Sequence, residues 1–196
     1  PTPEIMPEEA RAARPDAIER ILTTVAVTTW DIGREFGTIG ALLRPTDGRD
    51  WIVEVTTFRS DTYDPVSRKP QVRFGDTLTG DLLRRDFTVN AMALSVVTGA
   101  FTDEFGGLDD LADHLIRTPA SAELSFSDDP LRMMRAARFA SQLGFLPVPE
   151  VTDAMRDMAE RIDVVSAERV RDELTKLLLT DEPRAGLDLL VRTGLA

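Results

Sequence analysis

The hydrophobic pattern of the chain changes near residue 120, and this change constrains the fold more than any other feature. Before it, two strand-like segments flank the Asp-Gly turn of residues 45–49, a sequence typical of a β-hairpin. After it, the pattern is helical only. We therefore predict an α+β fold, in which a mixed or antiparallel sheet in residues 1–120 precedes an all-α domain in residues 121–196.

The individual segments follow from periodicity and from the residues that begin and end helices. Pro130 suits the first position of a helix and Gly144 the position after its end, while Ser166 is a favourable N-cap. We expect helices at residues 15–22, 82–93, 130–143, 151–161, 167–179 and 184–191, strands at 25–30, 36–43, 50–58, 92–97 and 101–105, and a long mobile loop at 60–74.

Composition excludes several classes of protein. At 196 residues and 42% hydrophobic content the chain can bury a core, and it contains neither a membrane span nor a signal peptide, so we expect a cytoplasmic protein. With no cysteine and one histidine, any metal would be held by carboxylates, which suits Mg²⁺. The net charge of -11 argues against an overall electrostatic grip on nucleic acid but allows a local basic groove.

One such groove is suggested by the stretch SFSDDPLRMMRAARF, residues 125–139. Asp128 and Asp129 precede a predicted helix, where carboxylates are favoured, and Asp128 lies four residues before Arg132. Arg132, Arg135 and Arg138 recur every three residues and so span about 120° of a helix surface. Because Arg135 and Arg138 have no acidic residue one turn upstream, the stripe predicts binding of a polyanion.

The residue types also suggest a choice of base. A carboxylate beside a guanidinium places a hydrogen-bond acceptor next to a donor, which complements the Watson–Crick edges of cytosine and of adenine but not those of guanine or uracil. We therefore predict that Asp129 and Arg132 select C and A, while Arg135 and Arg138 hold phosphates.

A second cluster lies in the segment GDLLRRDFTVNAMA, residues 80–93. Arg84 and Arg85 stand beside Asp86, and Asn90 follows Asp86 by four residues. These side chains suit a triphosphate and a ribose. The same pattern also fits an ordinary helix start with an Asp86–Asn90 contact.

Four motifs in order, DLLRRDFTVNAMA, FGGLDDLADHLIRTP, FSDDPLRMMRAARFASQLGF and SAERVRDELTKLLL, resemble those of bacterial class II tRNA nucleotidyltransferases, the CCA-adding enzymes and their poly(A) polymerase relatives. The resemblance covers roughly residues 30–195. It implies a nucleotidyltransferase head followed by a helical neck that chooses CTP and ATP, with tRNA 3′ ends as acceptors and Mg²⁺ as cofactor.

The resemblance also implies roles for single residues. Arg85 would contact triphosphate or ribose, and Asp86 with Asn90 would support that site. Asp128 stands where the family usually has Glu, in a supporting position beside Asp129. Glu54 matches the third carboxylate of the family's metal site, although a solvent-facing glutamate on a strand is the alternative. Residues 60–74 match a loop that helps the family's pocket change from C to A addition.

The chain departs from the family at its start. The family's Gly-Gly-x-Val-Arg-Asp turn and Asp-x-Asp metal pair are absent from the 196 residues, as are the family's body and tail. We therefore expect a piece truncated at both ends, inactive alone, that retains nucleotide selection from a CCA-adding enzyme. A poly(A) polymerase of the same family and a catalytically dead nucleotide- or RNA-binding module are the alternatives.

Overall fold

The computed structural model describes residues 14–45, 48–62, 71–74 and 77–196, with backbone alone at 59–62 and 71–74. The chain divides into two compact units, Pro1–Asp81 and Leu82–Ala196. The expected head–neck division at residue 120 falls within the second unit and stays a prediction. None of the helices in the described ranges is long and apolar enough to cross a membrane.

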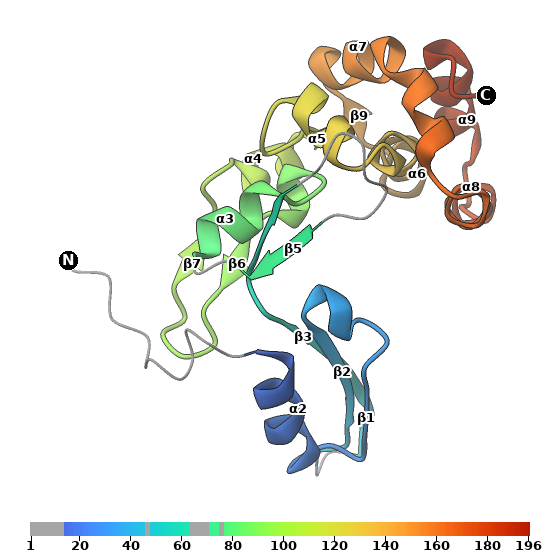
Figure 1. Ribbon diagram of the computed structural model, residues 1–196. Coiled ribbons are helices and arrows are strands. Elements are labelled where there is room, and N and C mark those ends of the chain that lie inside the picture. The colour runs from blue at the N-terminus through green and yellow to red at the C-terminus, as the bar shows by residue number, and fades with distance from the viewer. Residues whose placement is uncertain (1–13, 46–47, 63–70, 75–76) are drawn as a thin grey trace. The chain divides into compact units, whose positions relative to one another are not determined.

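In the first unit, one helix packs on a three-stranded antiparallel sheet (Figure 1). Its elements are α2 (Pro15–Thr23), β1 (Thr28–Trp30), the 3-10 turn η1 (Arg34–Phe36), β2 (Thr38–Leu43) and β3 (Trp51–Thr56), with β2 central. Ile18 and Leu22, one helical turn apart, are buried against Ile39 and Ala41 of β2. The predicted hairpin is confirmed, with β2 and β3 in register from Thr38 and Thr56 onward.

Two predictions in this unit need correction. The strand expected at 25–30 begins only at Thr28. The antiparallel strands β4 (Arg59–Thr62) and β5 (Gln71–Phe74) occupy the two ends of the segment expected as a loop at 60–74, while residues 63–70 lie outside the described residues. The prolines and mixed charge of this segment suggested a loop. Strands can pair through their backbones without an alternating pattern of apolar residues, so the sequence did not reveal these two.

The second unit is mostly helical, and α6 forms its centre. Its elements, after α3 (Leu78–Leu83) that enters from the first unit, are η2 (Thr88–Asn90), β6 (Ala93–Leu94), β7 (Phe101–Thr102), α4 (Gly107–Ala112), β8 (Leu115–Ile116), α5 (Ala122–Asp128), α6 (Leu131–Leu143), β9 (Leu146–Pro147), α7 (Pro149–Asp157), η3 (Ala159–Val164), α8 (Ala167–Leu178) and α9 (Arg184–Thr193). The α6 helix packs on α8 and α9, and Gly144 ends it with a left-handed φ of 69° as predicted.

Close helix packing explains why α9 carries a glycine at its contact with α6. A Cβ at Gly186 would collide with the carbonyl oxygen of Ala137, and the Gly186 N–H donates to Ser141 Oγ at 2.8 Å. The buried core around α6 includes Phe87, Phe126 and Met133. The unit is therefore built around the same helix that carries the arginine stripe.

The helix predicted at residues 82–93 is wrong. The α3 helix ends at Leu83, and Phe87 adopts an extended backbone with φ -135° and ψ 153° before the short η2 turn. Asp86 Oδ1 accepts the N–H of Phe87 at 2.9 Å, a local bond that competes with helix formation. Burial of Phe87 against Phe139, with ring centroids 5.5 Å apart, stabilises this departure from the helix.

The region after residue 120 also differs from the prediction in detail. The helix α5 was not predicted. Asp128, which was expected in a loop before the helix at 130–143, is the last residue of α5. The helix expected at 151–161 stops at Asp157 and continues as η3. Strands β8 and β9 add a short parallel pair, so the region is not purely helical at its edge. Ser166 occupies the N-cap of α8, but its side chain makes no capping bond.

Candidate functional site

A pocket of about 380 Å³ in the second unit gathers most of the charged residues that the sequence singled out. Five arginines and two aspartates line it, so its wall is positive although the chain carries a net charge of -11. We call it the arginine pocket, and its lining consists of Arg84, Arg85, Asp86, Asn90, Asp129, Leu131, Arg132, Arg135 and Arg169.

A buried polar network holds the η2 side of the arginine pocket in place. Asp110 of α4 accepts a hydrogen bond from Thr88 Oγ1 at 2.7 Å and from Arg117 Nε at 3.2 Å, while the Thr88 N–H donates to the Arg117 carbonyl at 2.8 Å. Gly107 allows α4 to lie directly against η2, since a Cβ there would collide with the Thr88 carbonyl oxygen. The contacts with α4 and Arg117 therefore hold the segment that carries Asp86 and Asn90 in place.

Asp103 anchors the start of α4. Its carboxylate accepts the N–H groups of Leu108 at 2.8 Å and Gly107 at 2.7 Å. These bonds, the one from Leu108 first, lower the pKa of the Asp103 carboxyl from its ordinary value because they stabilise the charged form.

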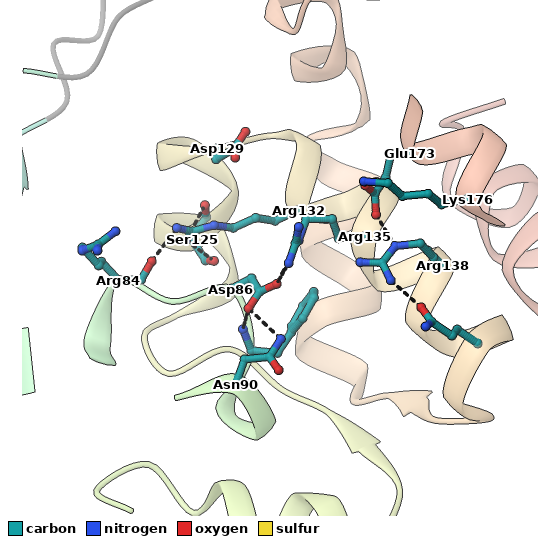
Figure 2. Close-up of polar contacts among 12 residues, drawn as sticks. Arg84, Asp86, Asn90, Ser125, Asp129, Arg132, Arg135, Arg138, Glu173 and Lys176 are labelled. Atoms are coloured by element: carbon teal, nitrogen blue, oxygen red, sulfur yellow. Dashed lines mark hydrogen bonds and ion pairs between the residues drawn. The ribbon is translucent and has the colours of Figure 1, made fainter. Parts of the chain in front are cut away.

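Asp86 connects the two sides of the arginine pocket (Figure 2). Its Oδ1 accepts from Asn90 Nδ2 at 3.1 Å, so the expected Asp86–Asn90 contact forms, although on a 3-10 turn rather than a helix. Its Oδ2 accepts from Arg135 Nε at 2.8 Å and also from the Arg135 Nη2 group. Asp86 thus orients one of the three arginines of α6.

Within the described ranges, the acceptors that hold Arg132 are uncharged (Figure 2). Its Nη1 donates to Ser125 Oγ at 2.8 Å and to the Ser125 carbonyl at 3.3 Å, and its Nη2 donates to the Arg84 carbonyl at 2.5 Å. Asp128, four residues upstream, is not among these acceptors in the described part of the chain. Arg132 is 8% exposed, and its hydrogen bonds to described residues go to a hydroxyl and two carbonyl oxygens rather than to a carboxylate.

Asp129 lies between α5 and α6, where its backbone is extended with φ -143° and ψ 98°. Its Oδ1 accepts weakly from the Leu131 N–H at 3.3 Å, and its Oδ2 accepts from Arg169 Nη2 at 3.0 Å. Arg169 comes from the first turn of α8. The two candidate base-reading residues therefore both line the arginine pocket, but each is held by a different neighbour.

Arg138 differs from the other two arginines of α6 because it does not line the arginine pocket. It forms an ion pair with Glu173 of α8 and donates to Gln142, and its guanidinium lies 4.2 Å from the centre of the Phe139 ring. Lys176 Nζ lies 3.6 Å from the second carboxylate oxygen of Glu173. The predicted cationic stripe is therefore largely neutralised by acidic partners from distant segments.

Two further predicted residues lie outside the arginine pocket. Asp128 is the last residue of α5. Glu54 is exposed on β3 in the first unit, opposite Gly40 of β2. Within the described ranges no group of three or more His, Cys, Asp or Glu side chains could hold a metal ion.

Sequence reasoning missed Arg169 and Ser125. The Arg169 side chain is 55% exposed, yet its guanidinium reaches Asp129. The available signal was the four-residue spacing of Arg169 and Glu173, which places both on one face of α8 toward α6. Ser125 gave no signal, because its contact with Arg132 depends on the unforeseen helix α5.

Two protein families match the chain. The "Poly A polymerase head domain" matches residues 8–117, more than half of the chain. The "Probable RNA and SrmB- binding site of polymerase A" matches residues 144–196. These matches agree with the resemblance drawn from the motifs.

Curated relatives are CCA-adding enzymes. The protein of Bacillus velezensis is 42% identical over 187 residues, and that of Levilactobacillus brevis is 43% identical over the same length. In both comparisons the match covers 95% of this chain and 45% of the relative. The chain therefore spans less than half the length of these relatives.

Solved structures of such enzymes share the fold. The Bacillus stearothermophilus CCA-adding enzyme in complex with CTP is 36% identical, with a TM-score of 0.79 over 94% of this chain and 42% of that one. A tRNA nucleotidyltransferase complexed with a primer tRNA and an incoming ATP analog is 28% identical, with a TM-score of 0.70 over 94% of this chain and 50% of that one. The predicted α+β class, with a nucleotidyltransferase head, is confirmed.

Proposed function

From the premise that this chain belongs to the nucleotidyltransferase family of the poly(A) polymerase head domain, we propose that it is the nucleotide-selecting part of a CCA-adding enzyme. The intact protein would add C and A from CTP and ATP to tRNA 3′ ends in the cytoplasm. The observation that carries this proposal is the arginine pocket, whose lining includes both candidate base readers and four of the five candidate phosphate and sugar contacts.

Base selection would rest on Asp129 and Arg132. Cytosine offers an N4–H donor beside the N3 acceptor, and adenine offers N6–H beside N1, so a carboxylate next to a guanidinium complements both. Guanine and uracil present these groups in the opposite order. Asp129 can use the oxygen that bonds only weakly to the Leu131 N–H, while Arg169 holds the other oxygen.

The phosphates and ribose would meet the arginines around Asp86. Arg85 and Arg135 line the arginine pocket, and Asp86 keeps Arg135 oriented. Asn90 is exposed at the same wall and can donate or accept a hydrogen bond to a ribose hydroxyl. Arg138, whose charge is paired with Glu173, would contribute mainly through the positive potential of α6.

Calorimetric titration with CTP, ATP, GTP and UTP tests this selection. We expect CTP and ATP to bind this chain about tenfold more tightly than UTP and GTP, because one mismatched pair of buried hydrogen-bonding groups costs about 1–3 kcal/mol. Asp129→Ala should abolish the difference. Asp172→Ala, which removes an exposed carboxylate of α8 outside the arginine pocket, should preserve it. Equal affinity of the unmodified chain for all four nucleotides would refute the proposed selection.

The transfer reaction itself is proposed for the intact protein, with Mg²⁺ as its cofactor and Glu54 as a candidate ligand. This chain contains no Asp-x-Asp pair, so we assign no metal-dependent step to its residues. A poly(A) polymerase would share the proposed base readers. Incorporation of CTP at a tRNA 3′ end by the intact protein distinguishes the two, since a poly(A) polymerase would use ATP alone.

A catalytically dead binding module is the second candidate function. The positive arginine pocket within an acidic chain favours binding of a nucleotide over binding of an extended RNA. The intact protein again decides the matter, because selective nucleotide binding without transfer to tRNA would support the module.

A further inference from the structure

The hydroxyl of Ser125 is the one side-chain acceptor that Arg132 contacts among the described residues. Ser125 lies on α5 and is 3% exposed, and its Oγ accepts from Arg132 Nη1 at 2.8 Å (Figure 2). The other acceptors are the carbonyl oxygens of Ser125 and Arg84, which any sequence would supply. Ser125 is therefore where a change of side chain can alter how Arg132 is held.

These acceptors fix the plane of the guanidinium. One lies at Nη2 and two lie at Nη1, so rotation of the planar group would break at least one bond. At least two of the five N–H groups of Arg132 remain without a protein acceptor within the described part of the chain. The protein thus holds one part of the guanidinium and leaves donors for another acceptor.

We propose that Ser125 is a positioning residue for base selection, which acts by fixing the guanidinium of Arg132 beside Asp129. This inference rests on the proposed function, because it assigns the remaining Arg132 donors to the N3 of cytosine or the N1 of adenine. Selectivity between bases depends on the relative position of an acceptor and a donor. Loss of the 2.8 Å bond lets the guanidinium turn and removes that alignment, while the phosphate contacts stay in place.

A merely structural role would have a different consequence. If the hydroxyl only supplied a hydrogen bond to the buried Arg132 guanidinium, its removal would destabilise the unit and lower the affinity for all four nucleotides alike. If it positions Arg132, its removal lowers the affinities for CTP and ATP and leaves those for UTP and GTP nearly unchanged. The CTP-to-UTP and ATP-to-GTP affinity ratios therefore separate the two roles.

Ser141 offers a matched control. It is also a buried serine, on α6, and its Oγ accepts the Gly186 N–H at 2.8 Å, but it does not line the arginine pocket. Both Ser125→Ala and Ser141→Ala remove one buried hydroxyl that accepts a hydrogen bond. Melting temperatures of the two variants report the shared cost to stability.

The test is calorimetric titration of the unmodified chain, Ser125→Ala and Ser141→Ala with the four nucleotides. We expect Ser125→Ala to lower both affinity ratios about tenfold, because this variant loses one charge-assisted hydrogen bond. Ser141→Ala should keep both ratios within about twofold. Ratios unchanged in Ser125→Ala, or lowered equally in both variants, would overturn the inference.

The unmodified chain distinguishes this failure from a failure of the proposed function. Selective binding that survives Ser125→Ala contradicts only the role of Ser125. Absence of selective binding in the unmodified chain contradicts the proposed selection and, with it, the role of Ser125.

Discussion

The two ends of the arginine stripe on α6 are held in opposite ways. Arg132 near the start of the helix is held by a hydroxyl and two carbonyl oxygens, whereas Arg138 six residues later is paired with the buried carboxylate of Glu173. Neutral acceptors orient a guanidinium without cancelling its charge. We propose that Arg132 keeps its charge for a ligand, while the ion pair of Arg138 with Glu173 joins α6 to α8.

The largest expected effect is at the Arg138 end. Glu173→Gln leaves the Arg138 charge unpaired in a site where the carboxylate is only 4% exposed, so the free energy of unfolding should fall by about 3 kcal/mol. Denaturant unfolding measures this change. Asp172→Asn on the same helix, where the carboxylate is 60% exposed, should change it by less than about 0.5 kcal/mol. Similar losses in the free energy of unfolding for both variants would contradict the assignment of a stabilising ion pair to Arg138 and Glu173.

Arg135 stands between the two ends, and its partner Asp86 should show an intermediate effect. Asp86→Asn removes the charge that pairs with Arg135 but keeps the shape of the side chain, so we expect a loss of about 1–2 kcal/mol in the free energy of unfolding. Arg135 would also lose its fixed orientation, which should lower the affinity for all four nucleotides by a similar factor. A selective loss for CTP and ATP alone would place Asp86 with the base readers instead.

The exposed pair of Asp129 and Arg169 should affect binding more than stability. Arg169→Met removes a surface ion pair, so unfolding should change by less than about 0.5 kcal/mol. The Asp129 carboxylate would lose its anchor, and CTP and ATP affinities should fall about threefold, in proportion to a weak surface interaction. Arg171→Met is the control, because Arg171 pairs with Asp172 outside the arginine pocket. Equal effects of both variants on nucleotide affinity would contradict an anchoring role.

The smallest expected effect concerns Asp103, a charged group held by neutral partners as Arg132 is. Its pKa is lowered by the Leu108 and Gly107 N–H groups, so its contribution to stability is present above the unfolded-state pKa of about 4 and is lost as pH falls through the folded-state pKa. The difference in unfolding free energy between the unmodified chain and Asp103→Asn should be constant from about pH 5 to 7 and shrink below about pH 4. A difference that grows on acidification would contradict this assignment.

Local sequence rules predicted much of the fold. The hairpin of β2 and β3, the start of α2 at Pro15 and the end of α6 at Gly144 follow from turn and capping residues, and the structure has all three. The helix prediction failed for the segment after Leu83, because the burial of Phe87 outweighs the helical propensity of that segment. Contacts with distant residues cannot be read from local propensity.

The candidate site shows the same division. The residue types and spacings singled out Asp129, Arg132 and Arg135, all of which line the arginine pocket. The sequence could not predict that Arg135 meets Asp86, 49 residues away, because no local pattern encodes such a pairing. The acidic partners that neutralise the stripe are visible only once the chain is folded.

The most direct test of the account is the ratio of CTP to UTP affinity in the unmodified chain and in Asp129→Asn. The asparagine keeps the size of the side chain but offers an N–H donor as well as an acceptor, so it can pair with uracil O4. If Asp129 and Arg132 select the base, the ratio is about ten in the unmodified chain and falls toward one in the variant. A ratio near one in the unmodified chain, or one unchanged by Asp129→Asn, would contradict base selection by Asp129 and Arg132.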